Sequence, residues 1–153
     1  MVKLDYTYDE LHNKALELLT VPPGQPIHID YILALTRGGL FFGIIASHLY
    51  DIPLIPISYS SKVGKGDDKN HKNELPYFYK RRLLILDDIA DSGHSLKEVV
   101  RYYKNRENTT TTGVFHCKET SVIAPDMIGW IVPENSGFIN YPWEKTSPFV
   151  LTT

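Results

Sequence analysis

The sequence of 153 residues contains a single cysteine, Cys117. An intramolecular disulfide is therefore impossible, and a zinc site built from several thiolates is excluded. No histidine or acid is recognisable in the sequence as a catalytic partner for Cys117, which favours a small buried strand residue over a nucleophile. A chain with so little cysteine fits a reducing compartment, and we expect a cytoplasmic protein.

Long apolar runs and an excess of one charge are also missing. No run is long enough to cross a bilayer, and the first nineteen residues, MVKLDYTYDELHNKALELL, lack the continuous apolar core of a signal peptide. The formal net charge is -2 and there is no long Lys/Arg run, which argues against nucleic acid as the main partner. We therefore expect no membrane span and no nucleic-acid partner, and any anion site has to be local.

What is present is the composition of one globular domain, with 42% apolar and 22% charged residues. Helix-like and strand-like runs alternate along the chain. The first part predicts a helix after a capping box at Thr7 and Glu10, a strand at 31–35 and a glycine turn that enters an apolar helix. The second part predicts a weak strand at 52–60 that prolines interrupt, a clear strand at 83–86 with a helix after it, and a strand at 109–118. This alternation predicts an α/β fold with a mainly parallel sheet flanked by helices, in which ligands collect at the carboxyl ends of the strands.

Two segments depart from this alternation. A polar loop with four lysines lies within about 58–76, and it is either a solvated loop or a lid that closes over an anionic ligand. Residues from about 119 to 153 are rich in proline and poor in helix formers, which predicts a small flap. The flap is too short to be a second domain, so residues 1–153 are expected to form a single domain.

The stretch LLILDDIADSGHSL, residues 83–96, carries the clearest chemical pattern. Asp87 and Asp88, the acid pair, follow a buried strand and suit either the vicinal hydroxyls of a sugar or a hydrated magnesium ion. Residues 92–95, the phosphate turn, offer hydroxyls and glycine backbone at a helix start, where a phosphate binds well. An acid pair after a strand is often a mere capping or surface feature, but the adjoining turn favours a phosphorylated ribose as ligand.

The sequence gives no support for other classes of phosphate-binding protein. The sequence has no G-x-x-x-x-G-K-[ST] motif for a nucleoside triphosphatase and no G-x-G-x-x-G motif for a dinucleotide fold. A receiver-type phosphoacceptor domain also combines two acids with a later lysine. Its acids belong on the first strand, however, whereas this pair follows the third predicted strand, and such a domain does not need the Arg-Gly-Gly turn.

The stretch 83–96 resembles the ribose-phosphate signature of type I phosphoribosyltransferases: an apolar strand, two acids, two variable residues and Asp-Ser/Thr-Gly-x-Ser/Thr. LALTRGGL resembles the pyrophosphate loop of that family, and Ser58-Tyr59 resembles the pair that opens the flexible catalytic loop in purine members. GFINYPWE resembles the base-binding hood of bacterial xanthine-guanine phosphoribosyltransferases. These matches lie between Leu33 and Glu144, which is most of the chain.

The resemblance implies the type I phosphoribosyltransferase fold with a hood at about 119–153, and it implies roles for individual residues. Asp91, which on its own could be a simple N-cap, would lie near N7 of a purine and accept or relay its proton. The implied binding residues are Asp87, Asp88, Ser92, Gly93, His94 and Ser95 for the ribose and 5′-phosphate, Thr36, Arg37 and Gly38 for pyrophosphate, Ser58 and Tyr59 in the catalytic loop, and Lys118, Phe138 and Ile139 for the purine. Mg²⁺ would bind Asp88, through water, with Glu144 as a second metal contact.

The implied activity joins a 6-oxopurine base to 5-phosphoribosyl-1-diphosphate (PRPP), giving a nucleoside 5′-monophosphate and pyrophosphate. Lys118 would select guanine, xanthine or hypoxanthine over adenine, because an ammonium group donates hydrogen bonds and cannot accept them. Relatives of this type are commonly homodimers or homotetramers. The alternative is a regulator of the same fold, which would sense PRPP or a nucleotide and bind RNA or a transcription partner.

Overall fold

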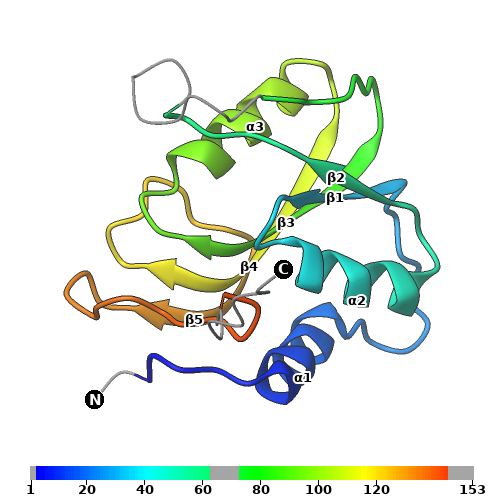
Figure 1. The fold of residues 1–153 in the computed structure, drawn as a ribbon. Helices are drawn as coiled ribbons and strands as arrows, with labels where there is room; N and C mark the ends of the chain where they lie inside the picture. Colours follow the sequence, from blue (N-terminus) through cyan, green and yellow to red (C-terminus); the bar gives the residue numbers. More distant parts are fainter. Residues whose placement is uncertain (1–2, 63–72, 145–153) are drawn as a thin grey trace, which may run out of the picture.

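The computed structural model describes residues 3–62 and 73–144 (Figure 1). These residues form one five-stranded, all-parallel sheet with the strand order β2-β1-β3-β4-β5 and helices on both faces. The elements are α1 (Tyr8–Leu19), β1 (Tyr31–Leu35), α2 (Leu40–Tyr50), β2 (Leu54–Ile57), β3 (Arg82–Ala90), α3 (His94–Lys104), β4 (Thr109–Lys118) and β5 (Met127–Val132). The predicted α/β fold is confirmed.

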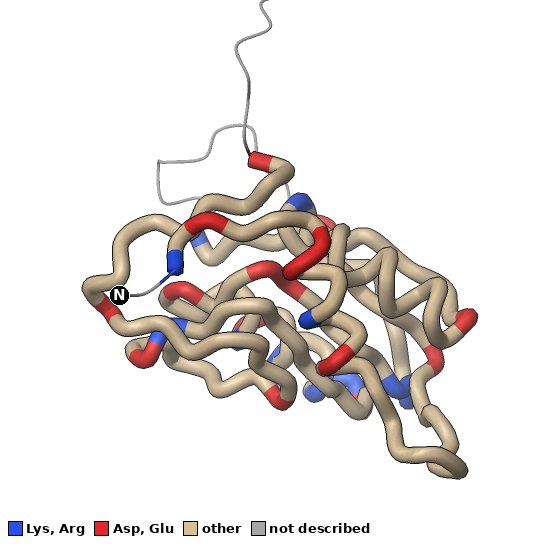
Figure 2. The backbone as a smooth tube through the Cα atoms, turned by 90° about the horizontal axis from the view of Figure 1, so that it is seen from below, with Lys and Arg blue, Asp and Glu red and all other residues tan. Residues whose placement is uncertain are grey.

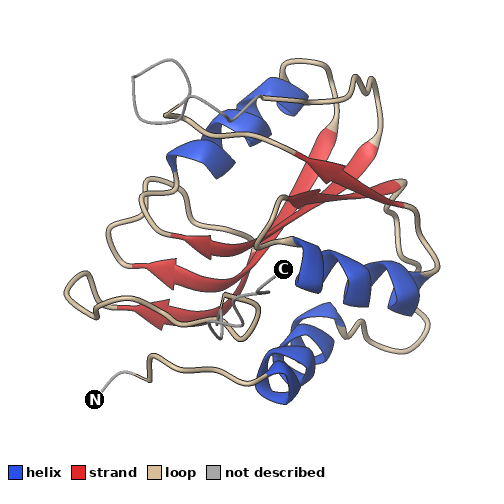
Figure 3. Ribbon diagram, viewed as in Figure 1, coloured by secondary structure: helices blue, strands red, loops and turns tan. Residues whose placement is uncertain are grey.

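The apolar strand β3 supplies both hydrophobic layers of the core. Figure 3 shows α1 and α2 on one side of the sheet and α3 on the other. Leu84 and Leu86 belong to the core cluster that includes α1 and α2, and Leu83 and Ile85 to the cluster that includes α3. Because successive side chains of a strand point to opposite faces, a strand covered on both sides has to be apolar throughout. This explains why the run at 83–86 has no polar alternation.

β3 is longer than the sequence predicts. We expected Asp87 and Asp88 directly after the strand, whereas the structure places both inside β3, which ends at Ala90. β1 pairs with β3 only as far as Leu86, but β4 remains paired with β3 up to Ala90 and so continues the strand. The acid pair therefore lies in the part of β3 that pairs with β4 but not with β1.

The two edge strands account for the less regular parts of the sequence. β2 is an edge strand, and an edge tolerates Pro56 because one side of the strand has no partner that needs its N–H. β5, at the opposite edge, belongs to the segment that we predicted as a hood, about 119–153, so this segment contributes a strand to the main sheet. Its sequence, MIGWIV, contains Gly129, and a glycine inside a strand weakens the sequence signal.

The helix boundaries follow local capping. The predicted capping box is present: Glu10 N donates to Thr7 Oγ1 at 3.2 Å, and Thr7 N donates to the Glu10 carboxylate at 2.9 Å. α3 begins at His94 directly after Gly93, which has φ 79°. Among the helices of the described residues, none has both the length and the apolar character needed to cross a membrane.

Candidate active site

The turn at residues 36–38, which follows β1, lies against the acid pair. Thr36 N donates to the carbonyl of Ile57 at 2.8 Å, and the peptide bond between Thr36 and Arg37 is cis. A β-carbon at Gly38 would collide with the carboxylate of Asp88, so any other residue here would force the Asp88 side chain to shift. The turn predicted to bind pyrophosphate and the acids predicted to bind ribose are therefore neighbours.

The carboxyl groups of the acid pair bind nearby main-chain N–H groups. Asp88 N donates to Oδ1 of Asp87 at 2.8 Å, and Ile89 N donates to Oδ1 of Asp88 at 2.7 Å. Loss of solvation, together with the charge of Asp88, raises the pKa of Asp87 well above its ordinary value, and loss of solvation also raises the pKa of Asp88. Two such carboxyl groups favour a bound cation or a hydroxyl donor over two unpartnered negative charges.

The phosphate turn at residues 92–95 leads into α3. The positive φ of Gly93 and its close approach to Ser121 leave no room for a side chain. Val122 N donates to the carbonyl of Ser92 at 2.9 Å, which ties the turn to the segment after β4. The side chain of His94, at the start of the helix, is exposed. The N-terminus of α3 thus presents main-chain N–H groups and the positive end of the helix dipole three residues after Asp91.

The first part of the predicted catalytic loop contacts α3. Ser61 N donates to Oγ of Ser95 at 3.1 Å, and the hydroxyl of Tyr59 donates to Glu98 at 2.8 Å. Main-chain hydrogen bonds between Ser58 and Glu74 hold the two ends of the loop together. The predicted loop at 58–76 therefore begins beside the phosphate turn, while its lysines Lys65, Lys69 and Lys72 lie outside the described residues.

Two of the residues predicted to face the purine form an ion pair. Nζ of Lys118 lies 2.7 Å from Oδ1 of Asp91. Phe138 is 88% exposed, so its ring is free to stack on a flat ligand, whereas the Ile139 side chain is buried in the core. After the effect of burial, the charge of Glu144 also raises the pKa of Asp88, so Glu144 lies within electrostatic reach of the acid pair.

Tyr141, which no sequence motif indicated as a site residue, also reaches the acid pair. The hydroxyl of Tyr141 donates to the main-chain carbonyl of Asp88 at 3.1 Å. Tyr141 lies in the matched segment GFINYPWE, but its neighbours in sequence give no sign of a contact with a residue 53 positions earlier. Only the folded chain brings the two together.

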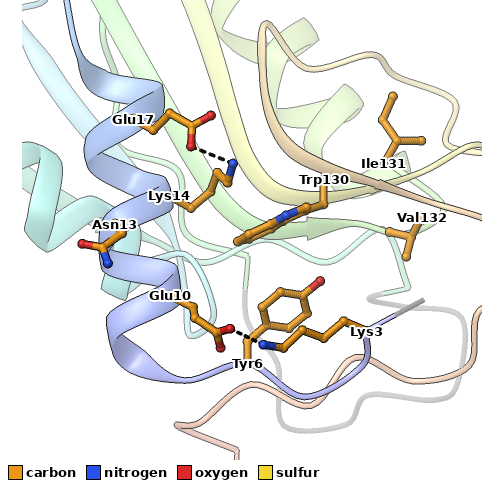
Figure 4. Close-up of a pocket in the computed structure, with 9 residues that line it drawn as sticks. All are labelled: Lys3, Tyr6, Glu10, Asn13, Lys14, Glu17, Trp130, Ile131 and Val132. Carbon is orange, nitrogen blue, oxygen red and sulfur yellow. Dashed lines mark hydrogen bonds and ion pairs between the residues drawn. The ribbon is translucent and has the colours of Figure 1, made fainter. Parts of the chain in front are cut away.

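A separate hollow of about 560 Å³ lies between α1 and the edge strand β5 (Figure 4). Its lining residues are Lys3, Tyr6, Glu10, Asn13, Lys14, Glu17, Trp130, Ile131 and Val132. None of them belongs to the predicted site, and the two lysines form ion pairs with the two glutamates. The Arg37 turn, the acid pair with the phosphate turn, and Lys118 instead lie at the carboxyl ends of β1, β3 and β4, whereas Ser58 and Tyr59 follow β2 and Phe138, Ile139 and Glu144 follow β5.

The carboxyl edge of this parallel sheet carries a glycine turn, an acid pair and a helix N-terminus, and ligands of open α/β proteins bind at this edge. The family model for the phosphoribosyl transferase domain matches residues 10–144. The chain belongs to the phosphoribosyltransferase family, as the resemblance indicated. No curated protein sequence matched the chain.

Solved structures share the fold at low sequence identity. A purine phosphoribosyltransferase from Pyrococcus horikoshii is 22% identical with a TM-score of 0.76, covering 96% of this chain and 97% of the other. A xanthine-guanine-hypoxanthine phosphoribosyltransferase from Helicobacter pylori is 18% identical with a TM-score of 0.70, covering 92% and 90%. A Neisseria gonorrhoeae protein with bound ppGpp is 20% identical with a TM-score of 0.69, covering 95% and 92%.

Proposed function

We propose that the protein is a purine salvage enzyme that transfers 5-phosphoribosyl from PRPP to a 6-oxopurine base. The observation that carries this proposal is the order of groups along three neighbouring strands. The Arg37 turn follows β1, the acid pair and phosphate turn lie at the end of β3, and Lys118 ends β4. Pyrophosphate, ribose 5-phosphate and purine would occupy these three positions in the same order.

The acid pair fits Mg²⁺ in its usual mode of binding. Magnesium takes oxygen ligands, and in phosphate-transfer sites one or two carboxylates share the ion with substrate phosphates and water. Within residues 3–62 and 73–144, no group of three or more His, Cys, Asp or Glu side chains is arranged to hold a metal ion. Asp88 would hold the ion through water, with Glu144 as a second contact, and the ion would neutralise charge on the pyrophosphate leaving group.

The chain's own residues would stabilise charge on both sides of the bond that breaks. Arg37 and the main-chain N–H groups of its turn would bind the negative charge that develops on pyrophosphate. Asp91 would take the proton from N7 as the base attacks the anomeric carbon. Ser58 and Tyr59 begin the loop that would cover the site, because an oxocarbenium-like centre has to be protected from water.

Replacing Lys118 with glutamine is expected to weaken discrimination against adenine. Glutamine can both donate and accept, whereas the ammonium group only donates and therefore favours the 6-oxo group. A charge-assisted hydrogen bond contributes about 1.5–3 kcal/mol, so the ratio of kcat/KM for guanine to that for adenine should fall by about 10- to 100-fold. Steady-state kinetics with both bases measures this ratio.

The matched control is Lys104→Gln, which removes an exposed lysine at the far end of α3. This control should leave the ratio of the two kcat/KM values unchanged. An unchanged ratio in Lys118→Gln itself would show that Lys118 does not select the base.

The reaction is tested by incubating the protein with PRPP, MgCl₂ and each of guanine, xanthine, hypoxanthine and adenine. Nucleotide and pyrophosphate should form in equal amounts with at least one 6-oxopurine, and chelation of Mg²⁺ should stop the reaction. Absence of nucleotide with every base, using protein of verified fold, would reject the enzymatic proposal.

The second candidate function is a regulator that senses a nucleotide. The observation in its favour is the shared fold with the Neisseria gonorrhoeae protein that was solved with bound ppGpp. The charge distribution does not favour an RNA partner, because acidic and basic positions are interspersed over the fold (Figure 2) and the net charge is -2. Salt-sensitive RNA binding without base-dependent release of pyrophosphate would favour the regulator over the enzyme.

We further propose that the enzyme works in the cytoplasm as a homodimer or homotetramer. The single cysteine agrees with a reducing compartment, and assembly is common among type I phosphoribosyltransferases. Light scattering during size-exclusion chromatography measures the molar mass, and a monomer at micromolar concentration would contradict this assembly.

A further inference from the structure

The hydroxyl of Tyr141 lies between the acid pair and a buried histidine. It donates to the main-chain carbonyl of Asp88 at 3.1 Å and lies 2.7 Å from Nδ1 of His116. Tyr141 is 2% exposed and His116 is completely buried. Polar contacts in such a low-dielectric interior are costly to leave unpaired, so this network should hold its members in place.

The main chain at Asp88 has β4 as a neighbour, through the pairs of Asp87 with Val114 and of Ile89 with His116, but it has no strand partner on the β1 side. Pairing with β1 ends at Leu86, two residues before Asp88. The N–H groups of Asp88 and Ile89 bind the side-chain oxygens of the acid pair, not a strand on the β1 side. The Tyr141 hydroxyl therefore supplies a fixed donor to the carbonyl of Asp88 in the part of β3 that β1 no longer supports.

Ring packing fixes the position of this hydroxyl. Trp143 stacks on Tyr141 with ring centroids 4.7 Å apart and an interplanar angle of 6°. His116 is enclosed by Tyr6 and Trp130, whose rings are drawn in Figure 4, with centroid distances of 4.5 Å and 5.0 Å. Burial lowers the pKa of His116 to about 4, so its ring is neutral at physiological pH.

The segment that carries Tyr141 is itself fastened to the body of the protein. Asn140 N donates to the carbonyl of Leu4 at 2.7 Å, and Tyr6 N donates to the carbonyl of Asn140 at 3.3 Å. Ile139 is buried in the core. A tyrosine on such a fixed segment can hold another main chain in position, which a tyrosine on a loose loop could not do.

We propose that Tyr141 is a positioning residue for the phosphoribosyl donor: its hydroxyl, oriented by His116, holds the main chain at Asp88 so that the acid pair is aligned to bind PRPP. This inference deepens the proposed function and rests on it. Tyr141 acts through Asp88 and does not touch the substrate. Its loss should therefore weaken PRPP binding much more than purine binding.

Tyr141→Phe tests this inference because it removes the hydroxyl and keeps the stacked ring. Calorimetric titration with PRPP and MgCl₂ should give a Kd about tenfold higher than that of the wild type, whereas the KM for the purine should change less than twofold. Tyr50→Phe is the control, since its hydroxyl also donates to a main-chain carbonyl, that of Leu19, away from the site. The control should bind PRPP like the wild type.

His116→Phe provides a second test that leaves Tyr141 intact. It keeps an aromatic ring between Tyr6 and Trp130 but removes the nitrogen that orients the hydroxyl. The Kd for PRPP should rise, and the double variant should bind no more weakly than Tyr141→Phe alone, because both changes break one network. Additive effects of the two changes would overturn the inference.

The outcomes separate the inference from the proposed function. Unchanged PRPP affinity in both single variants, beside a wild type that binds PRPP, would overturn the positioning role alone. An equal loss of affinity for PRPP and purine would also overturn it. If the wild type binds PRPP but transfers its phosphoribosyl group to no base, the proposed reaction is rejected, while the affinity changes still support the positioning role. If the wild type binds no PRPP, both proposals are rejected.

Discussion

Replacing Asp88 with asparagine is expected to lower the kcat for nucleotide formation by at least about 100-fold, which corresponds to about 2.7 kcal/mol of transition-state stabilisation. Asparagine retains a side-chain oxygen that can accept the hydrogen bond from Ile89 N, now 2.7 Å long. The substitution therefore removes the charge and preserves the local main-chain contact. Initial rates at saturating PRPP, MgCl₂ and purine measure the effect.

The same substitution should make the unliganded protein more stable at neutral pH. Loss of solvation raises the folded-state pKa of Asp88, so between about pH 4, where the unfolded chain releases this proton, and the raised pKa, the folded state retains it. The contribution of this carboxyl group to stability is thus complete at low pH and is lost as the pH rises through the folded-state pKa. Asparagine does not ionise, so its advantage should be absent near pH 4 and largest at pH 7–8.

Thermal unfolding at several pH values checks the stability difference, and an increase of about 2–4 °C in Tm would correspond to about 1 kcal/mol. Asp51→Asn serves as the control, because Asp51 is exposed and has φ 54°, a conformation that asparagine adopts well. Neither its kcat nor its Tm should change. If Asp88→Asn kept a wild-type kcat, the charge of Asp88 would have no part in the reaction.

Replacing Gly93 with alanine should damage both stability and PRPP binding. Gly93 has φ 79°, which costs a residue with a β-carbon about 1–2 kcal/mol, and the new β-carbon would also collide with Ser121. The collision is relieved when the side chains of Ser121 and Ile123 shift or when the start of α3 moves away from the segment after β4. We expect the Tm to fall by more than 5 °C, at about 2–4 °C per kcal/mol. The KM for PRPP should rise at least about tenfold, because displaced N–H groups bind phosphate poorly.

Gly24→Ala is the matched comparison for Gly93→Ala. Gly24 has a similar φ of 83°, but a β-carbon there would meet no atom within 4 Å, so this variant carries the backbone strain without the collision. Its Tm should fall by only a few degrees, about 2–4 °C per kcal/mol, and its KM for PRPP should be unchanged. Equal behaviour of the two variants would mean that the packing of Gly93 against Ser121 has no importance for the site.

The sequence predicted those parts of the fold that local patterns determine. The continuous apolar run at 83–86 indicated a strand buried on both faces, and the capping box at Thr7 and Glu10 marked the start of α1, as observed. These signals are local because a helix cap or a buried strand depends mainly on residues near it in sequence. The family signature at 83–96 was equally local, and the family match agrees with it.

The features that the sequence did not predict depend on contacts between segments far apart in the chain. β3 ends at Ala90 and not, as predicted, at Leu86, because β4 remains paired with it there. No pattern within β3 reveals this pairing. The contact of Tyr141 with Asp88 and the ion pair of Lys118 with Asp91 likewise join segments that are far apart in the chain. The resemblance indicated that Lys118 and Asp91 face the same ligand, but it did not indicate that they contact each other.

The unequal lengths of β1 and β3 have a consequence for the turn that follows β1. β3 continues three residues beyond the level at which β1 ends, which is about 10 Å of strand. The turn after β1 lies against the end of β3: a β-carbon at Gly38 would come within 2.0 Å of Oδ2 of Asp88, and one at Gly39 within 2.4 Å of the carbonyl oxygen of Leu86. The early end of β1 thus leaves this turn the space beside Asp88 that a longer β1, paired with β3, would occupy.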